Sequence, residues 1–119
     1  MSDHETQPLL DLITSTLDDD KAQDLVTIDL TYKSSIADAM VIASGQSNRH
    51  VSAMAGHLRE ILKNTGFGNP RMEGLENSDW VLLDMGDVIV HLFRPEVRAY
   101  YNIEKMWSVT MPEATSKQS

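Results

Sequence analysis

The sequence contains no cysteine and is poor in aromatic residues. The absence of cysteine excludes disulfide scaffolds, thiolate metal sites and thiol nucleophiles. No apolar run approaches the roughly 20 residues that span a bilayer. The acidic start, Met1–Glu5, differs from the basic and then apolar start of a signal peptide. We therefore expect a cytoplasmic protein with no membrane partner.

Basic residues are also few. Lys and Arg number 10 against 18 Asp and Glu, which gives a formal net charge of −8. Proteins that bind nucleic acid through its phosphates carry the opposite balance, so direct DNA or RNA binding is disfavoured. An acidic surface instead favours a basic partner, because complementary charge steers the encounter.

The length of 119 residues, with 41% hydrophobic and 24% charged residues, is typical of one globular domain. Residues 1–7 and 112–119 hold too few apolar side chains to pack, so we predict flexible tails at both ends. No repeat, low-complexity tract or linker divides the rest. The sequence therefore predicts a single domain over residues 8–111.

The spacing of apolar residues predicts alternating helices and strands. After Pro8, the apolar positions indicate a short amphipathic helix that ends before or within Asp18–Asp20, since acidic groups oppose the helix dipole there. Strand-like runs cover residues 25–30, 39–44 and 71–74, and residues 80–93 form a hairpin with Gly86 in the left-handed region. The result is an α/β domain with a four- or five-stranded sheet.

The clearest element is a helix over about residues 47–65. Its apolar residues recur at helical spacing, Ser47 can cap its first turn, and Gly66 can end it in the left-handed conformation. Gly56 inside this helix costs about 1 kcal/mol relative to alanine. A close packing contact at Gly56 would explain that cost.

The last third of the chain carries the candidate recognition features. The second hairpin strand has one wholly apolar face, formed by Val88, Val90 and Leu92, which we expect in the core. Its other face is mixed and can meet a partner; it is formed by Asp87, Ile89, His91 and Phe93. Pro95 can start a helix with a polar stripe of Arg98, Tyr101, Glu104 and Trp107. Aromatic residues cluster here as core, as recognition surface, or as both.

Catalytic and metal-binding patterns are weak. The four histidines lack ligand spacing, and Asp84 with Asp87, or Asp29 with Asp38, are more simply solvated turn residues than magnesium ligands. The turn at residues 44–47 can bind an anion, yet no phosphate-binding motif or G-x-S-x-G accompanies it. For His91, the roles of general base, hydrogen-bonded core residue and binding-face residue stay open. We expect no enzyme activity, cofactor or metal.

Four segments together match a known pattern. They are Val41–Ser47, Glu73–Gly74, Trp80–Phe93 and Arg98–Trp107, in that order. In these segments the sequence resembles the Iojap family, also called the ribosomal silencing factors, over roughly residues 9–107. The resemblance implies a compact α/β domain with a mixed sheet, similar in topology to nucleotidyltransferases but without their catalytic set.

The resemblance also implies a function. Members of this family bind the large ribosomal subunit through a basic ribosomal protein at the subunit-joining face, block the small subunit and repress translation when nutrients are short. Matched to this sequence, the expected partner-binding residues are Glu73, Trp80, Leu82, Asp84, His91, Phe93, Arg98, Tyr101 and Glu104.

Two other hypotheses stay open. One is a magnesium-dependent nucleotidyl- or phosphotransferase that uses Asp29, Asp38 or Asp84. The other, compatible with ribosome binding, is a homodimer of the free protein, because an exposed aromatic face can pair with itself.

Overall fold

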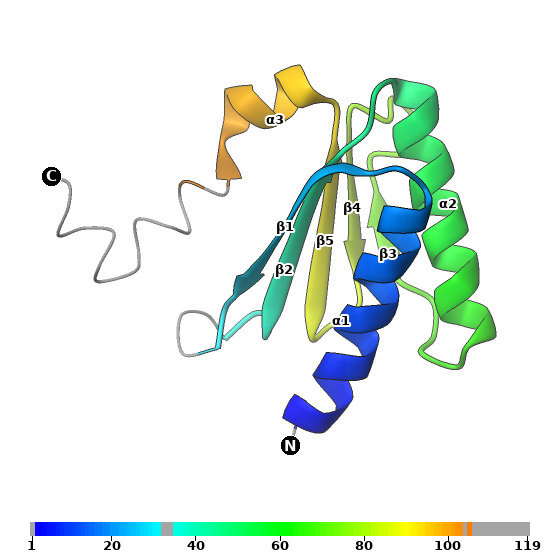
Figure 1. Ribbon diagram of the computed structural model, residues 1–119, viewed down its shortest axis with the longest axis vertical. Coiled ribbons are helices and arrows are strands. Elements are labelled where there is room, and N and C mark those ends of the chain that lie inside the picture. The colour runs from blue at the N-terminus through cyan, green and yellow to red at the C-terminus, as the bar shows by residue number, and fades with distance from the viewer. Residues whose placement is uncertain (1, 32–34, 104, 106–119) are drawn as a thin grey trace, which may run out of the picture.

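Five strands form one sheet in the computed structural model, which describes residues 2–31, 35–103 and 105. The strands are β1 (Gln23–Asp29), β2 (Ala39–Ser44), β3 (Arg71–Glu73), β4 (Trp80–Asp84) and β5 (Val88–Phe93), and the helices are α1 (Ser2–Asp19), α2 (Asn48–Asn64) and α3 (Pro95–Tyr101). The strand order is β1-β2-β5-β4-β3 (Figure 1). Only β2 and β5 pair in parallel, so the sheet is mixed. The predicted fold class is confirmed.

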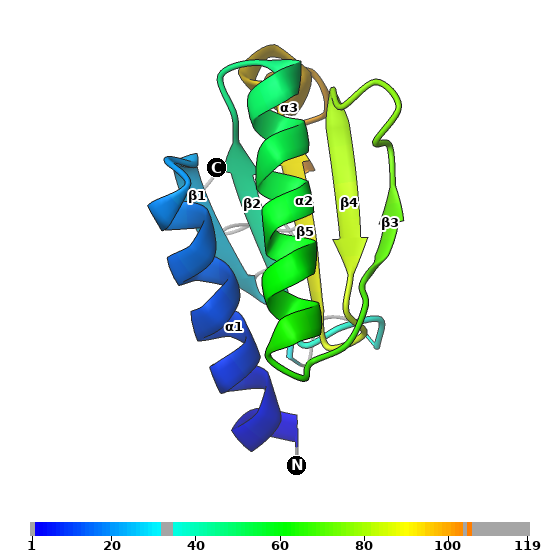
Figure 2. The same ribbon diagram turned by 90° about the vertical axis from the view of Figure 1, so that its right-hand side faces the viewer.

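Helices α1 and α2 pack side by side on one face of the sheet (Figure 2). The main core lies between these helices and the strands, and it contains the apolar stripe of α2 together with Val88, Val90 and Leu92 of β5. This confirms the prediction that the wholly apolar face of β5 is core. The short helix α3 lies over one end of the opposite sheet face.

Local signals fix both ends of α2. The Ser47 side chain accepts a hydrogen bond from the His50 backbone N–H at 3.1 Å, and Gly66 follows the helix with a φ of +89°. Both features were predicted. A packing contact does not explain Gly56, because Gly56 is exposed and a Cβ there would have no close neighbour within the described part of the chain.

The first helix starts earlier than the sequence indicates. Residues 2–7, which we expected in a flexible tail, belong to α1, and Pro8 lies inside the helix. Thr6 is buried, and its hydroxyl donates a hydrogen bond to the Asp38 carboxylate at 3.1 Å. A polar contact therefore attaches this turn to the sheet, which a count of apolar residues does not detect. The helix ends at Asp19, inside the acidic run as predicted.

The hairpin between β4 and β5 follows its predicted turn. Residues 85–87 connect the strands, and Gly86 has a φ of +89° while its N–H donates to the Asp84 carboxylate at 2.8 Å. Among the described residues, no helix combines the length and the apolar character needed to cross a membrane.

Candidate partner-binding surface

The sheet face turned away from α1 and α2 carries most of the predicted site residues. Cross-strand pairing places Glu73 opposite Leu82, Leu82 opposite His91, and Trp80 opposite Phe93. Their neighbours Val81 and Leu83 point into the main core instead. We call this surface the open face and define it by Glu73, Trp80, Leu82, Asp84, Ile89, His91 and Phe93. Residues far apart in the sequence thus share one surface, as the sequence analysis expected.

Aromatic rings form layers at the end of the open face near α3. Phe93 is only 1% exposed and stacks against Trp80 with ring centroids 4.9 Å apart. The Tyr101 ring centroid lies 4.8 Å from that of Trp80 and Tyr101 is 54% exposed, while Tyr100 is 81% exposed. The described part of the aromatic cluster is therefore both core and surface, with Trp80 joining the two.

His91 adjoins this cluster and is buried, with its ring centroid 5.9 Å from Trp80 and 5.8 Å from Phe93. The Trp80 indole N–H donates to His91 Nδ1 at 3.0 Å, so the imidazole is neutral and carries its proton on Nε2. Burial lowers the pKa of His91 from 6.5 to about 4. Of the three open roles, the structure supports the hydrogen-bonded core residue. His91 and Phe93, both expected to contact a partner, are buried and hold Trp80 in place instead.

Arg98 and the end of α3 also differ from the predicted partner-binding helix. The half-buried Arg98 donates from Nη1 to the Ser44 hydroxyl at 2.9 Å, which ties α3 to the end of β2. The predicted polar stripe does not continue as one helix, because α3 ends at Tyr101 and Asn102 takes a left-handed φ of 49°. Glu104 and Trp107 lie outside the described residues.

Two shallow grooves flank Trp80. One is lined by Glu73, Gly74, Trp80 and Leu82. The backbone can close beside Trp80 because Gly74 has a φ of +91°, and a Cβ there would overlap the Trp80 carbonyl oxygen. The other groove lies beside α3 and includes Asp79, Glu96 and Tyr100, which the sequence analysis did not place in the site. In the sequence, only their positions could have indicated a role in the site: Asp79 precedes Trp80, and Glu96 and Tyr100 lie in the helix that follows Pro95.

The carboxylates of the transferase hypothesis make local contacts. Asp29 accepts from the Thr31 N–H at 3.0 Å, while Asp38 and Asp84 accept the contacts from Thr6 and Gly86 described above. No three His, Asp or Glu side chains of the described ranges converge as metal ligands. These contacts anchor a helix and turns.

Comparison with known families decides the assignment. The profile described as "Ribosomal silencing factor during starvation" matches residues 3–119. The chain belongs to the ribosomal silencing factor family. The resemblance seen in residues 41–107 is thereby confirmed.

Three relatives show how far the ribosomal silencing factor similarity extends. The chain is 59% identical over 100 residues to "Ribosomal silencing factor RsfS" of Zymomonas mobilis, covering 83% of this chain and 74% of that one. A crystal structure of a Chromobacterium violaceum protein matches with a TM-score of 0.82 at 40% identity, covering 85% of this chain and 84% of that one. The mouse "Mitochondrial assembly of ribosomal large subunit protein 1" is 32% identical over 103 residues, 84% of this chain but 45% of the mouse protein.

Proposed function

We propose that this ribosomal silencing factor binds the large ribosomal subunit through a basic ribosomal protein at the subunit-joining face. Bound there, it blocks the small subunit and represses translation under nutrient limitation. The observation that carries this proposal is the family match over residues 3–119, whose description names silencing during starvation. The mouse relative, named for assembly of the large subunit, supports that subunit as the target.

The physical properties of the open face support a protein partner. The chain carries a net charge of −8. Exposed Glu73 lines the groove beside Trp80, and half-buried Asp84 adds a carboxylate at the other end of β4. Such a surface repels RNA phosphates and attracts Lys and Arg side chains. Steric blocking requires a surface and no reacting group, so the proposed role is non-enzymatic. Because the proposed target is the ribosome, the proposed location is the cytoplasm.

Sedimentation with purified subunits tests the proposal. We expect the protein to travel with free large subunits, not with small subunits, and to lower the yield of joined ribosomes when it is added before the small subunit. Equal binding to both subunits, with subunit joining unchanged, would contradict the proposal.

Tyr101→Ala is expected to weaken large-subunit binding by about 2 kcal/mol or more, as loss of an aromatic anchor does. Because Tyr101 is 54% exposed, the free energy of unfolding should change by less than about 1 kcal/mol. Fluorescence-detected binding and urea denaturation measure the two effects.

Val90→Ala is the matched control, since Val90 is fully buried on the other face of the sheet. It should lose stability and, while folded, keep its affinity. A Tyr101 variant that unfolds early but still binds would remove Tyr101 from the proposed contact surface.

Raising the salt concentration is expected to slow association with the large subunit. Exposed carboxylates steer a basic partner over about one Debye length, which is about 8 Å at physiological ionic strength. Stopped-flow association rates between low and physiological salt measure this effect. A rate that does not change with salt would argue against an acidic recognition surface.

A further inference from the structure

We propose that the groove beside α3 receives an arginine side chain of the basic protein partner. We call it the α3 groove and define it by its lining residues, Asp79, Trp80, Glu96, Val97, Tyr100 and Tyr101. This inference rests on the proposed function and specifies which chemical group of the partner the surface recognises. Three observations support it: the arrangement of the rings, the carboxylates, and the charge of the chain.

The aromatic walls of the α3 groove expose ring faces at different angles. The Trp80 and Tyr101 rings are tilted by 45°, and Tyr100 meets Tyr101 edge to face with centroids 5.0 Å apart. Both tyrosines are more than half exposed, so a ligand can reach them. A guanidinium is planar and weakly hydrated, and it stacks on aromatic faces. The walls therefore suit the flat cation of arginine.

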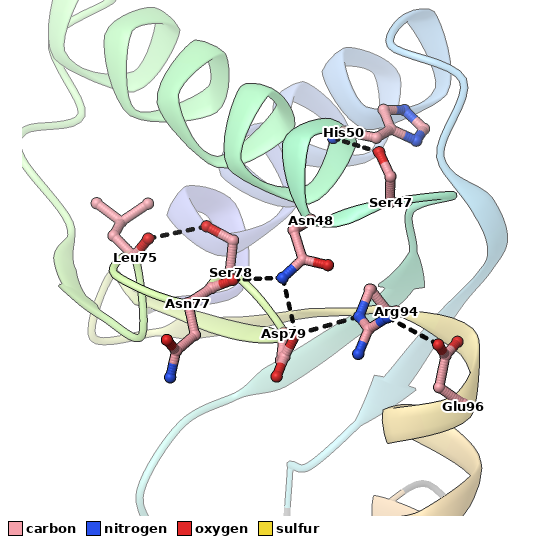
Figure 3. Close-up of polar contacts among 9 residues, drawn as sticks. All are labelled: Ser47, Asn48, His50, Leu75, Asn77, Ser78, Asp79, Arg94 and Glu96. Atoms are coloured by element: carbon pink, nitrogen blue, oxygen red, sulfur yellow. Dashed lines mark hydrogen bonds and ion pairs between the residues drawn. The ribbon is translucent and has the colours of Figure 1, made fainter.

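Two carboxylates lie at the rim of the same groove. Arg94 holds both of them, donating from Nε to Asp79 Oδ1 at 3.1 Å and from Nη1 to Glu96 Oε2 at 2.8 Å (Figure 3). Asn48 also donates to Asp79 Oδ1, at 2.9 Å. Among the described residues, Asp79 Oδ2 and Glu96 Oε1 have no hydrogen-bond donor. The carboxylates are thus held in place while one oxygen of each can accept a further N–H group.

Charge distinguishes arginine from other occupants. Two carboxylates and the one guanidinium of Arg94 leave the rim with a net negative charge, within a chain of net charge −8. Phosphate groups and acidic peptides are repelled by this rim. A second copy of the chain brings the same net charge of −8, so this rim favours a basic partner over a second copy. Lysine meets the charge requirement, but its compact, strongly hydrated ammonium does not stack as guanidinium does.

An NMR titration of the full ¹⁵N-labelled chain tests the assignment directly. The probe is N-acetyl-arginine methylamide, and its control is the citrulline compound, which has the same shape without the charge. We expect saturable shifts of the Trp80 indole N–H with the arginine probe and a response at least about tenfold weaker with citrulline. Equal responses, or none, would overturn the proposal. So would an equal response to the lysine analogue, or a shift that depends only on protein concentration and marks self-association.

Two variants connect the groove to the ribosome. Glu96→Gln and Tyr100→Ala alter exposed residues, and each should lower both the arginine response and the large-subunit affinity by about tenfold. Glu60→Gln, an exposed carboxylate on α2, is the matched control and should change neither.

The two hypotheses fail in different ways. Unchanged large-subunit affinity in both groove variants would overturn the α3 groove assignment and leave the proposed function standing. A wild-type protein that binds the arginine probe but no large subunit would overturn the proposed function and still support the groove as an arginine site.

Discussion

Phe93→Ala is expected to lower the free energy of unfolding by about 3 to 5 kcal/mol, a large share of the 5 to 15 kcal/mol typical of a whole domain. Phe93 is 1% exposed and stacks with Trp80 and with His91, whose ring centroids lie 4.9 and 5.8 Å away. Its removal leaves a cavity under the aromatic layers that the sheet backbone cannot close. Urea denaturation followed by circular dichroism measures the loss.

Tyr100→Ala provides the comparison, because Tyr100 is 81% exposed and its loss should change stability by about 0.5 kcal/mol at most. Phe93→Leu should recover part of the lost stability by refilling the cavity. If Phe93→Ala were no more destabilising than Tyr100→Ala, the buried Phe93 ring would not be what stabilises the aromatic cluster.

The second large effect is a loss of stability on acidification. Burial lowers the pKa of His91 to about 4 in the folded protein, whereas the histidine side chain has a pKa of 6.5 in the unfolded chain. Above pH 6.5 the ring is neutral in both states, and its contribution is constant. Between pH 6.5 and pH 4 only the unfolded state takes up the proton. The free energy of unfolding therefore decreases as the pH is lowered through this range, by about 3 kcal/mol in total. Below pH 4 this group adds no further change.

His91→Gln should remove that component, because glutamine keeps an acceptor for the Trp80 N–H but does not titrate. The measurement is the free energy of unfolding of both proteins from pH 7.5 to 4. All other groups are the same in the two proteins, so their effects cancel in the difference. Parallel curves for the two proteins would show that His91 is not held neutral by its surroundings.

Short-range patterns predicted most of the fold. The spacing of apolar residues located α2, the hairpin and the core face of β5, since each depends on neighbours within one or two turns or on strand alternation. The N-terminal turn of α1 could not be found this way. It depends on the contact between Thr6 and Asp38, 32 residues apart, which no local pattern encodes.

The sequence predicted which residues share the candidate surface, but not which of them are buried. Strand alternation placed His91 and Phe93 on the mixed face of β5, and the family resemblance added Trp80 and Leu82. The cross-strand register shows that these residues share one surface. Strand alternation could not show that His91 and Phe93 are buried, because Val97 of α3 packs against the cluster that contains Phe93 and His91 is held by Trp80, contacts that it does not encode. Nor could it bring Asp79 and Glu96 together, since their contact is made through Arg94.

In the proposed complex, the open face, and not the helical face, contacts the large subunit. Since the chain has no cysteine, Glu73→Cys and Glu60→Cys each create one labelling site, on β3 at the open face and on α2 at the helical face. Each variant is coupled to a bulky polyethylene glycol maleimide and sedimented with large subunits. We expect the label at position 73 to abolish co-sedimentation and the label at position 60 to leave it intact. Binding that survives the label at 73 but is lost with the label at 60 would contradict the account.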